Sequence, residues 1–163
     1  MLIDESWYQK PEGIKKRTSS GGVIIRREDE RVLLALARHK GYTGYVLPKG
    51  GVDKGESLLE AAQREIEEEA GFSDLELLAD LGVLERLSFS KTRWIKTHYY
   101  LFLTRQINPQ PTETERHVEP HWFDLETLPT MFWPEQQSLI EAKKEFILET
   151  LEAFDQAQST GQR

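Results

Sequence analysis

The sequence contains no cysteine. A disulfide framework, a thiolate metal site and a cysteine nucleophile are therefore excluded, and nothing in the composition indicates an oxidising compartment. The stretch from Met1 to Trp7 also lacks the basic start and the apolar run of a signal peptide, and no later stretch approaches the length of a membrane span. We therefore expect a cytoplasmic protein without a membrane partner.

The chain also lacks an excess of basic residues. It has 21 Lys and Arg against 28 Asp and Glu, which gives a formal net charge of -7 at pH 7. Binding to a nucleic-acid backbone normally requires a basic face, so this charge disfavours a nucleic-acid partner. An anionic substrate would need a local basic patch or metal ions. The sequence does not indicate an oligomeric state.

The length and the apolar periodicity predict one domain over residues 1–163, with a frayed tail at residues 156–163. Strands that alternate with two helices predict an α+β fold, a sandwich in which helices cover both faces of a sheet. The expected strands are residues 19–27, 32–37, 45–47, 75–84, 94–104 and 120–125, with a loop at 48–51, and the expected helices are residues 57–70 and 134–154.

The helix expected at residues 57–70 has signals at both ends. Ser57 can cap its first turn and Glu60, three residues later, can return the bond, while Gly71 can adopt the left-handed conformation that ends a helix. Its apolar residues recur at helical spacing and predict one stripe that packs on the sheet: Leu59, Ala62, Ile66 and Ala70.

Three glutamates of this helix carry the chemical argument. Glu65, Glu68 and Glu69 stand at positions i, i+3 and i+4, so their carboxylates leave the helix close together and repel one another. Divalent cations that prefer oxygen ligands, such as Mg²⁺ or alternatively Mn²⁺, would relieve this repulsion. The competing interpretation is an ordinary solvated helix face.

Residues 50–72 resemble the Nudix box, G-x5-E-x7-R-E-U-x-E-E-x-G-U, where U is a bulky apolar residue. Each fixed position is matched at the required spacing, which makes the signal strong. The matching residues are Gly50, Glu56, Arg64, Glu65, Ile66, Glu68, Glu69, Gly71 and Phe72.

The resemblance implies a Nudix-like sandwich with a mixed sheet and a loop-helix-loop catalytic box. It implies that Glu65, Glu68 and Glu69 hold divalent metal together with the carbonyl of Gly50. It also implies that Glu56 and Arg64 form a supporting charge pair. The expected reaction is the attack of a water on phosphorus, without a covalent intermediate.

The general base stays open at this point. Similar proteins use either a glutamate of the box or one from a later loop, so Glu65 and Glu115 are the two candidates for the base. Glu68 is also an expected catalytic residue, because the metal ion that it would bind takes part in the reaction. Glu113 and Glu119 are rivals of Glu115.

The stretch Leu47-Pro48-Lys49-Gly50-Gly51 resembles the L-P-K-G approach of the diadenosine polyphosphate and diphosphoinositol branches. The C-terminal half, from Trp122 to Glu135, is similar to that of bacterial diadenosine polyphosphate hydrolases. We therefore expect a pyrophosphohydrolase that acts on a small nucleotide, preferably a diadenosine polyphosphate. The alternatives are a nucleoside triphosphate, an RNA 5' end, a diphosphoinositol polyphosphate, or an inactive nucleotide sensor.

Substrate contacts are expected from basic and aromatic side chains near the box. Arg38 and Lys49 could bind phosphate, and Tyr45 could stack on a base, which makes these three the favoured substrate-binding residues. Further candidates of the same two kinds are His39, Lys40, Lys91, Arg93, Trp94, Tyr99 and Trp133.

Overall fold

A six-stranded sheet forms the centre of the fold within residues 3–39, 43–111 and 118–161, the part of the chain that the computed structural model describes. The strands lie in the order β4-β5-β1-β2-β6, and β3 pairs with β1 outside this path. β1 runs parallel to β5 and every other named pair is antiparallel, so the expected mixed sheet is confirmed. The strands are β1 (Lys15–Glu28), β2 (Arg31–His39), β3 (Lys49–Gly51), β4 (Glu76–Leu87), β5 (Arg93–Leu103) and β6 (Val118–Asp124).

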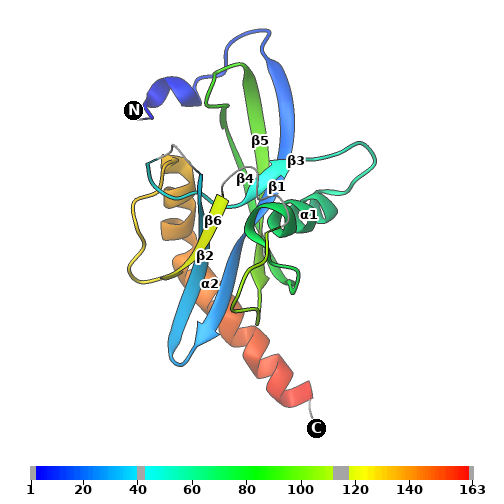
Figure 1. The fold of residues 1–163 in the computed structure, drawn as a ribbon, viewed down its shortest axis with the longest axis vertical. Helices are drawn as coiled ribbons and strands as arrows, with labels where there is room; N and C mark the ends of the chain where they lie inside the picture. Colours follow the sequence, from blue (N-terminus) through cyan, green and yellow to red (C-terminus); the bar gives the residue numbers. More distant parts are fainter. Residues whose placement is uncertain (1–2, 40–42, 112–117, 162–163) are drawn as a thin grey trace.

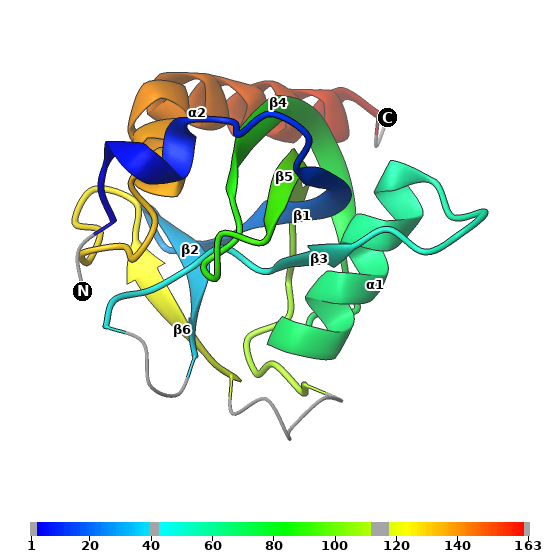
Figure 2. The ribbon, with the colours of Figure 1, turned by 90° about the horizontal axis from the view of Figure 1, so that it is seen from above.

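Helices cover both faces of this sheet, as Figure 2 shows for α1 (Leu58–Ala70) and α2 (Pro134–Gly161), and Figure 1 labels the elements. Alternate residues of a strand point to opposite faces. Val23 and Ile25 of β1 pack in one core with Ile140 of α2, whereas Ile24 packs in another core with Ile66 of α1. The expected helix/sheet/helix sandwich is therefore confirmed.

α1 has the caps that its sequence predicts. The Ser57 hydroxyl accepts a bond from the Glu60 N–H, and the Glu60 side chain accepts one from the Ser57 N–H, which completes a capping box. Gly71 ends the helix at φ 79° and donates its N–H to the carbonyls of Ile66 and Glu67. The hydroxyl of Ser20 on β1 also donates to the carbonyl of Leu58 at 2.6 Å, so the start of α1 is bonded to the sheet.

α2 is longer than the sequence pattern indicates. The helix continues to Gly161, so the prediction of a frayed tail from residue 156 is wrong for residues 156–161. The residues beyond 154 include good helix formers such as Gln156 and Ala157. The Thr160 hydroxyl also donates to the carbonyl of Gln156 at 3.2 Å. Along the described ranges, no helix has both the length and the apolar character that a membrane crossing needs.

The short strand that precedes α1 lies later in the chain than expected. Val46 makes only an isolated bridge with Ala37, and the regular strand is β3, where the sequence suggested a loop. Glycines on both sides permit this pairing, because a β-carbon on Gly21 would lie 2.2 Å from the carbonyl oxygen of Pro48. β3 lies between β1 and α1 and thereby fixes the position of Gly50.

Candidate active site

The glutamates of α1 differ sharply in burial. Glu65 and Glu69 are 8% and 5% exposed, Glu68 is partly exposed, and Glu67 is exposed. A solvated helix face would leave all of these carboxylates in water, so that interpretation is wrong for Glu65 and Glu69. Burial of a carboxylate is costly unless it is paired or binds a cation, which marks these two as candidate functional groups.

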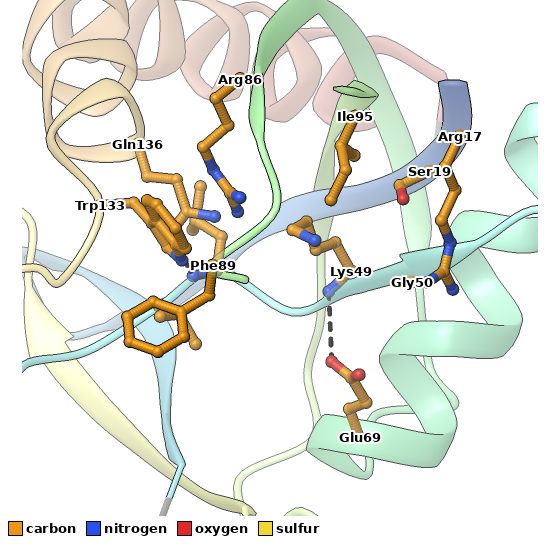
Figure 3. A pocket seen from close by; sticks show the side chains of 12 residues that line it. Arg17, Ser19, Lys49, Gly50, Glu69, Arg86, Phe89, Ile95, Trp133 and Gln136 are labelled. Carbon is orange, nitrogen blue, oxygen red and sulfur yellow. Dashed lines mark hydrogen bonds between the residues drawn. The ribbon is translucent and has the colours of Figure 1, made fainter. Parts of the chain in front are cut away.

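Gly50 lies directly against Glu65. A β-carbon at position 50 would come within 2.0 Å of Glu65 Cδ and 2.1 Å of its Oε2. The next residue back, Lys49, donates its backbone N–H to Glu69 Oε2 at 3.3 Å (Figure 3). β3 therefore brings its backbone into contact with two of the three proposed metal ligands.

Arg64 makes the supporting contacts that its place in the box implies. Its Nε and Nη2 donate to the two carboxylate oxygens of Glu56 at 2.7 and 2.9 Å, and Nη2 also donates to the carbonyl of Gly51 at 2.9 Å. The bond from Arg64, reinforced by the backbone N–H of Asp53, lowers the pKa of Glu56 from 4.5 to about 2. Arg64 therefore ties the loop to the helix.

The same arginine also reaches the proposed ligands. Its Nη1 donates to Glu65 Oε1 at 2.8 Å and to Glu68 Oε2 at 3.2 Å. Among the residues that the structure describes, no three acidic or histidine side chains form a preassembled metal site. The donor set nevertheless fits a hard divalent cation, because it consists of oxygens and because Gly50 leaves room beside Glu65 that a β-carbon would fill.

A cavity of about 240 Å³ opens on the sheet side of Glu69 (Figure 3). Burial lowers the pKa of the Lys49 ammonium to about 8, and repulsion from Arg86 adds to this effect. The cavity is lined by three cationic side chains, Arg17, Lys49 and Arg86, and by one proposed metal ligand, Glu69. Its lining residues are Arg17, Ser19, Val46, Leu47, Lys49, Gly50, Glu69, Arg86, Phe89, Ile95, Trp133 and Gln136.

A second, more polar groove lies beside β3 and the loop that follows it. Glu65, Glu68 and Arg64 form its helix side, and Arg17 lines both this groove and the cavity. The three glutamates proposed as metal ligands therefore lie along two neighbouring hollows, with Glu69 in one and Glu65 and Glu68 in the other. A substrate that contacts all three must extend from the groove toward the cavity.

The other expected contacts are distributed unevenly. Lys49 lines the cavity, as does Trp133 among the further candidates, but Arg38 and Tyr45 do not. Tyr45 packs edge-on against Phe123 at 4.7 Å between ring centroids, and the exposed Arg38 lies 6.0 Å from the Tyr45 ring. Glu113 and Glu115 lie outside the described residues. Glu119 lies on β6, where its backbone pairs with Arg38.

Arg86 is a site residue that the sequence did not reveal. It is 5% exposed on β4, and its Nε donates to Glu135 Oε2 at 2.6 Å. Its guanidinium lies 3.4 Å from the centroid of Trp133. Its local sequence carries no signal, because charged Glu85 precedes it and its partner Glu135 is remote in the chain and reaches it from the start of α2.

The family profile of the NUDIX domain matches residues 16–143. The chain is 31% identical over 108 residues to the zebrafish "8-oxo-dGDP phosphatase NUDT18", a match covering 64% of the chain and 31% of that protein. It is 30% identical over 142 residues to the "RNA pyrophosphohydrolase" of Bartonella henselae, covering 76% and 80%. The solved structure of a MutT Nudix hydrolase from Burkholderia pseudomallei superposes with a TM-score of 0.63 at 29% identity, covering 78% and 97%.

The extent of the match differs among these proteins. The chain spans less than a third of the zebrafish relative but most of the Bartonella protein and nearly all of the Burkholderia structure. The matched region of the profile contains all of α1, β3 and the lining of the cavity as far as Gln136. The likeness therefore includes the candidate site.

Proposed function

Because this chain belongs to the Nudix family, we propose that it is a divalent-metal-dependent pyrophosphohydrolase that splits a phosphoanhydride bond in a nucleoside diphosphate-linked substrate. The observation that carries the proposal is the burial of Glu65 and Glu69 against the backbone of β3. Buried carboxylates in this position could bind a divalent cation, and the basic side chains of the neighbouring cavity, Arg17, Lys49 and Arg86, could bind the phosphates of a substrate.

Four residues would hold the cation in this proposal: the carbonyl of Gly50 and the carboxylates of Glu65, Glu68 and Glu69. When bound, a divalent ion, with Mg²⁺ favoured and Mn²⁺ as a substitute, neutralises phosphate charge and lowers the pKa of water. Arg64, paired with Glu56, ties the loop to the helix and also donates to Glu65 and Glu68, two of the carboxylates that would hold the cation.

The protein's own residues then bind and activate the reactants. Lys49 places positive charge in the cavity beside Glu69 and attracts phosphate oxygens. A glutamate removes the proton from the attacking water, and the oxygen attacks phosphorus as the bond to the leaving phosphate breaks. Glu65 and Glu115 stay the two proposed bases, and Glu65 has the support of its position in the polar groove.

Diadenosine polyphosphates are the favoured substrates. The support is the Leu47-Pro48-Lys49-Gly50-Gly51 segment, whose lysine does line the cavity, and a lining that combines basic with aromatic side chains. An RNA 5' end is the second candidate, because the match with the "RNA pyrophosphohydrolase" of Bartonella henselae extends over 80% of that protein.

Product analysis by chromatography tests the proposal. The protein is incubated with magnesium and diadenosine polyphosphates, nucleoside triphosphates, triphosphorylated RNA, nucleotide sugars and diphosphoinositols. Glu69→Gln serves as the inactive variant and Glu67→Gln, on the exposed side of the same helix, as the matched control. Cleavage that Glu69→Gln alone abolishes supports the reaction, and the fastest substrate decides the class. No cleavage of any compound would favour a nucleotide-sensing module and contradict the proposal.

A further inference from the structure

Arg86 is held from several sides yet keeps hydrogen-bond donors for a ligand. Nε donates to Glu135 Oε2 at 2.6 Å, and Nη1 donates to the carbonyl of Leu87 at 3.0 Å. The guanidinium also covers the ring of Trp133 at 3.4 Å. Within the described part of the chain these contacts leave Nη2 without a hydrogen-bond acceptor, and the side chain lines the cavity (Figure 3).

The carboxylate that holds Arg86 is itself fixed by the N-terminal 3-10 helix, Glu5–Tyr8. The Tyr8 hydroxyl donates to Glu135 Oε1 at 2.6 Å, so each oxygen of Glu135 has its own donor. Burial and this bond to Glu135 raise the pKa of Tyr8, which therefore keeps its proton at neutral pH. The contacts with Tyr8, Glu135 and Trp133 thus hold the buried guanidinium of Arg86 in a fixed orientation at the wall of the cavity.

The cavity offers donors in excess of acceptors. Its charged lining consists of Arg17, Lys49 and Arg86 against Glu69. The amide of Gln136 is already occupied, because its Oε1 accepts from the Leu47 N–H at 3.0 Å and its Nε2 donates to the Tyr99 hydroxyl at 3.0 Å. A negatively charged ligand group that is rich in acceptors complements this charged lining.

An aromatic stacking site is less well supported. Trp133 is 4% exposed, and Arg86 already covers its ring. Phe89, the other aromatic residue of the lining, packs edge-on against Trp133 at 6.5 Å between ring centroids. The volume of about 240 Å³ lies below the range of roughly 300–1,000 Å³ that is usual for whole drug-sized ligands. The cavity accordingly suits one part of a substrate.

We infer that Arg86, together with Lys49, binds a phosphate group of the substrate inside the cavity, separate from the anhydride that is cleaved beside Glu65 and Glu68. The inference rests on the proposed function and narrows it. The substrate would carry at least one phosphate beyond the cleaved anhydride, as in a chain of three or more phosphates. Nucleotide sugars and dinucleotides whose only phosphates are the two of the cleaved linkage would be poor substrates.

Binding of inorganic triphosphate in the absence of divalent metal tests this position directly, because no metal can then bridge the anion to the glutamates. Calorimetry would compare the wild-type protein with Arg86→Lys and Arg86→Gln. The matched control is Arg31→Lys, at an exposed arginine at the start of β2. Loss of a charge-assisted bond is expected to weaken triphosphate binding by about tenfold or more in both Arg86 variants, whereas the control should bind as the wild type does.

Arg86→Lys keeps a charge beside Glu135 and so protects the fold, but one ammonium cannot replace the guanidinium fork that reaches both Glu135 and a ligand. If thermal denaturation shows that Arg86→Gln does not fold, the Arg86→Lys variant alone tests the inference. In hydrolysis assays, kcat/KM for triphosphate-chain substrates should fall at least about tenfold more than kcat/KM for diphosphate-linked ones.

Three results would overturn the inference: unchanged triphosphate binding, equal losses on both substrate classes, or a changed preference between guanine and adenine nucleotides with phosphate binding intact. The last result would show that Arg86 recognises the nucleobase and not a phosphate. Failure of the proposed function is distinguishable, because metal-free triphosphate binding that depends on Arg86 without hydrolysis of any substrate would leave the anion position standing.

Discussion

The α-carbon of Gly50 faces the carboxylate of Glu65 so closely that a β-carbon would lie 2.0 Å from Glu65 Cδ. A strand residue and a helix residue thus share a space that only glycine leaves open. The consequence is that the backbone of β3 lies directly against carboxylates of α1, since the neighbouring Lys49 N–H also donates to Glu69.

Gly50→Ala should therefore impair catalysis more than folding. The methyl group would push away the end of a flexible side chain, so the fold can adjust, but the Glu65 carboxylate would leave its position. Displacement of a ligand by about 1 Å is expected to lower kcat about 100-fold. Steady-state kinetics and thermal denaturation of the same samples measure both effects.

Gly55→Ala is the control for that variant. Gly55 has φ 83°, and a β-carbon added there would meet no atom within 4 Å, so the substitution strains the same loop without touching a glutamate. It should cost about 1 kcal/mol of stability and retain most of the activity. Equal losses of activity in both variants would contradict the role given to the Gly50 and Glu65 contact.

Glu68→Gln and Glu69→Gln should each lower turnover by orders of magnitude while the protein stays folded, because each loses a charged metal ligand. The amide oxygen that Glu69→Gln introduces can still accept the Lys49 N–H, so that packing is preserved. Glu67→Gln changes the same functional group on the exposed side of α1 and should stay active. Full activity in both ligand variants would remove the metal-site assignment.

The ion pair of Glu56 with Arg64 predicts a pH-dependent stability. The folded-state pKa of Glu56 is about 2, below its ordinary 4.5. A lowered carboxylate pKa stabilises the fold fully above about pH 4.5, and the contribution is lost as the pH falls through about 2. The Tm of the wild-type protein should thus exceed that of Glu56→Gln at about pH 6 to 8.

The same pair of proteins provides the check at acid pH. Between about pH 4.5 and pH 2 the Tm difference should shrink steadily, because the wild-type carboxyl becomes protonated and neutral like the amide. Differential scanning calorimetry across this interval measures it. A difference that grows on acidification would show that Glu56 has a raised pKa and is not held by Arg64.

Ser57→Ala should destabilise the protein by about 1 kcal/mol, because the Glu60 N–H at the start of α1 loses its acceptor. Ser57→Thr retains a hydroxyl and should cost less. Urea denaturation at neutral pH gives both values from the transition midpoints. Equal stability of the alanine variant and the wild type would mean that water replaces the cap at no cost.

The sequence predicted α1 well because its signals are local. Ser57, Glu60 and Gly71 specify the two ends, and the apolar stripe through Ile66 specifies the face that packs on the sheet. The order of the glutamates follows from the same helix. The loop-helix-loop box could therefore be located before any tertiary contact was known.

Features that depend on distant contacts were not predictable. β1 starts at Lys15 and not at residue 19, because Lys15 pairs with Arg93 of the parallel strand β5. β3 forms only because glycines let it approach β1. The burial of Arg86 requires Glu135 and Trp133 of a remote segment, and no local pattern in β4 indicates such partners.

Binding of Mn²⁺, followed by electron paramagnetic resonance together with hydrolysis in the same samples, tests the central claim most directly. The wild-type protein and Glu67→Gln should bind Mn²⁺ and hydrolyse a nucleoside polyphosphate, with activity rising as the site fills. Glu69→Gln should lose both binding and turnover. Mn²⁺ binding and hydrolysis that persist unchanged in Glu69→Gln would contradict the assignment of this helix as the metal-binding element of the active site.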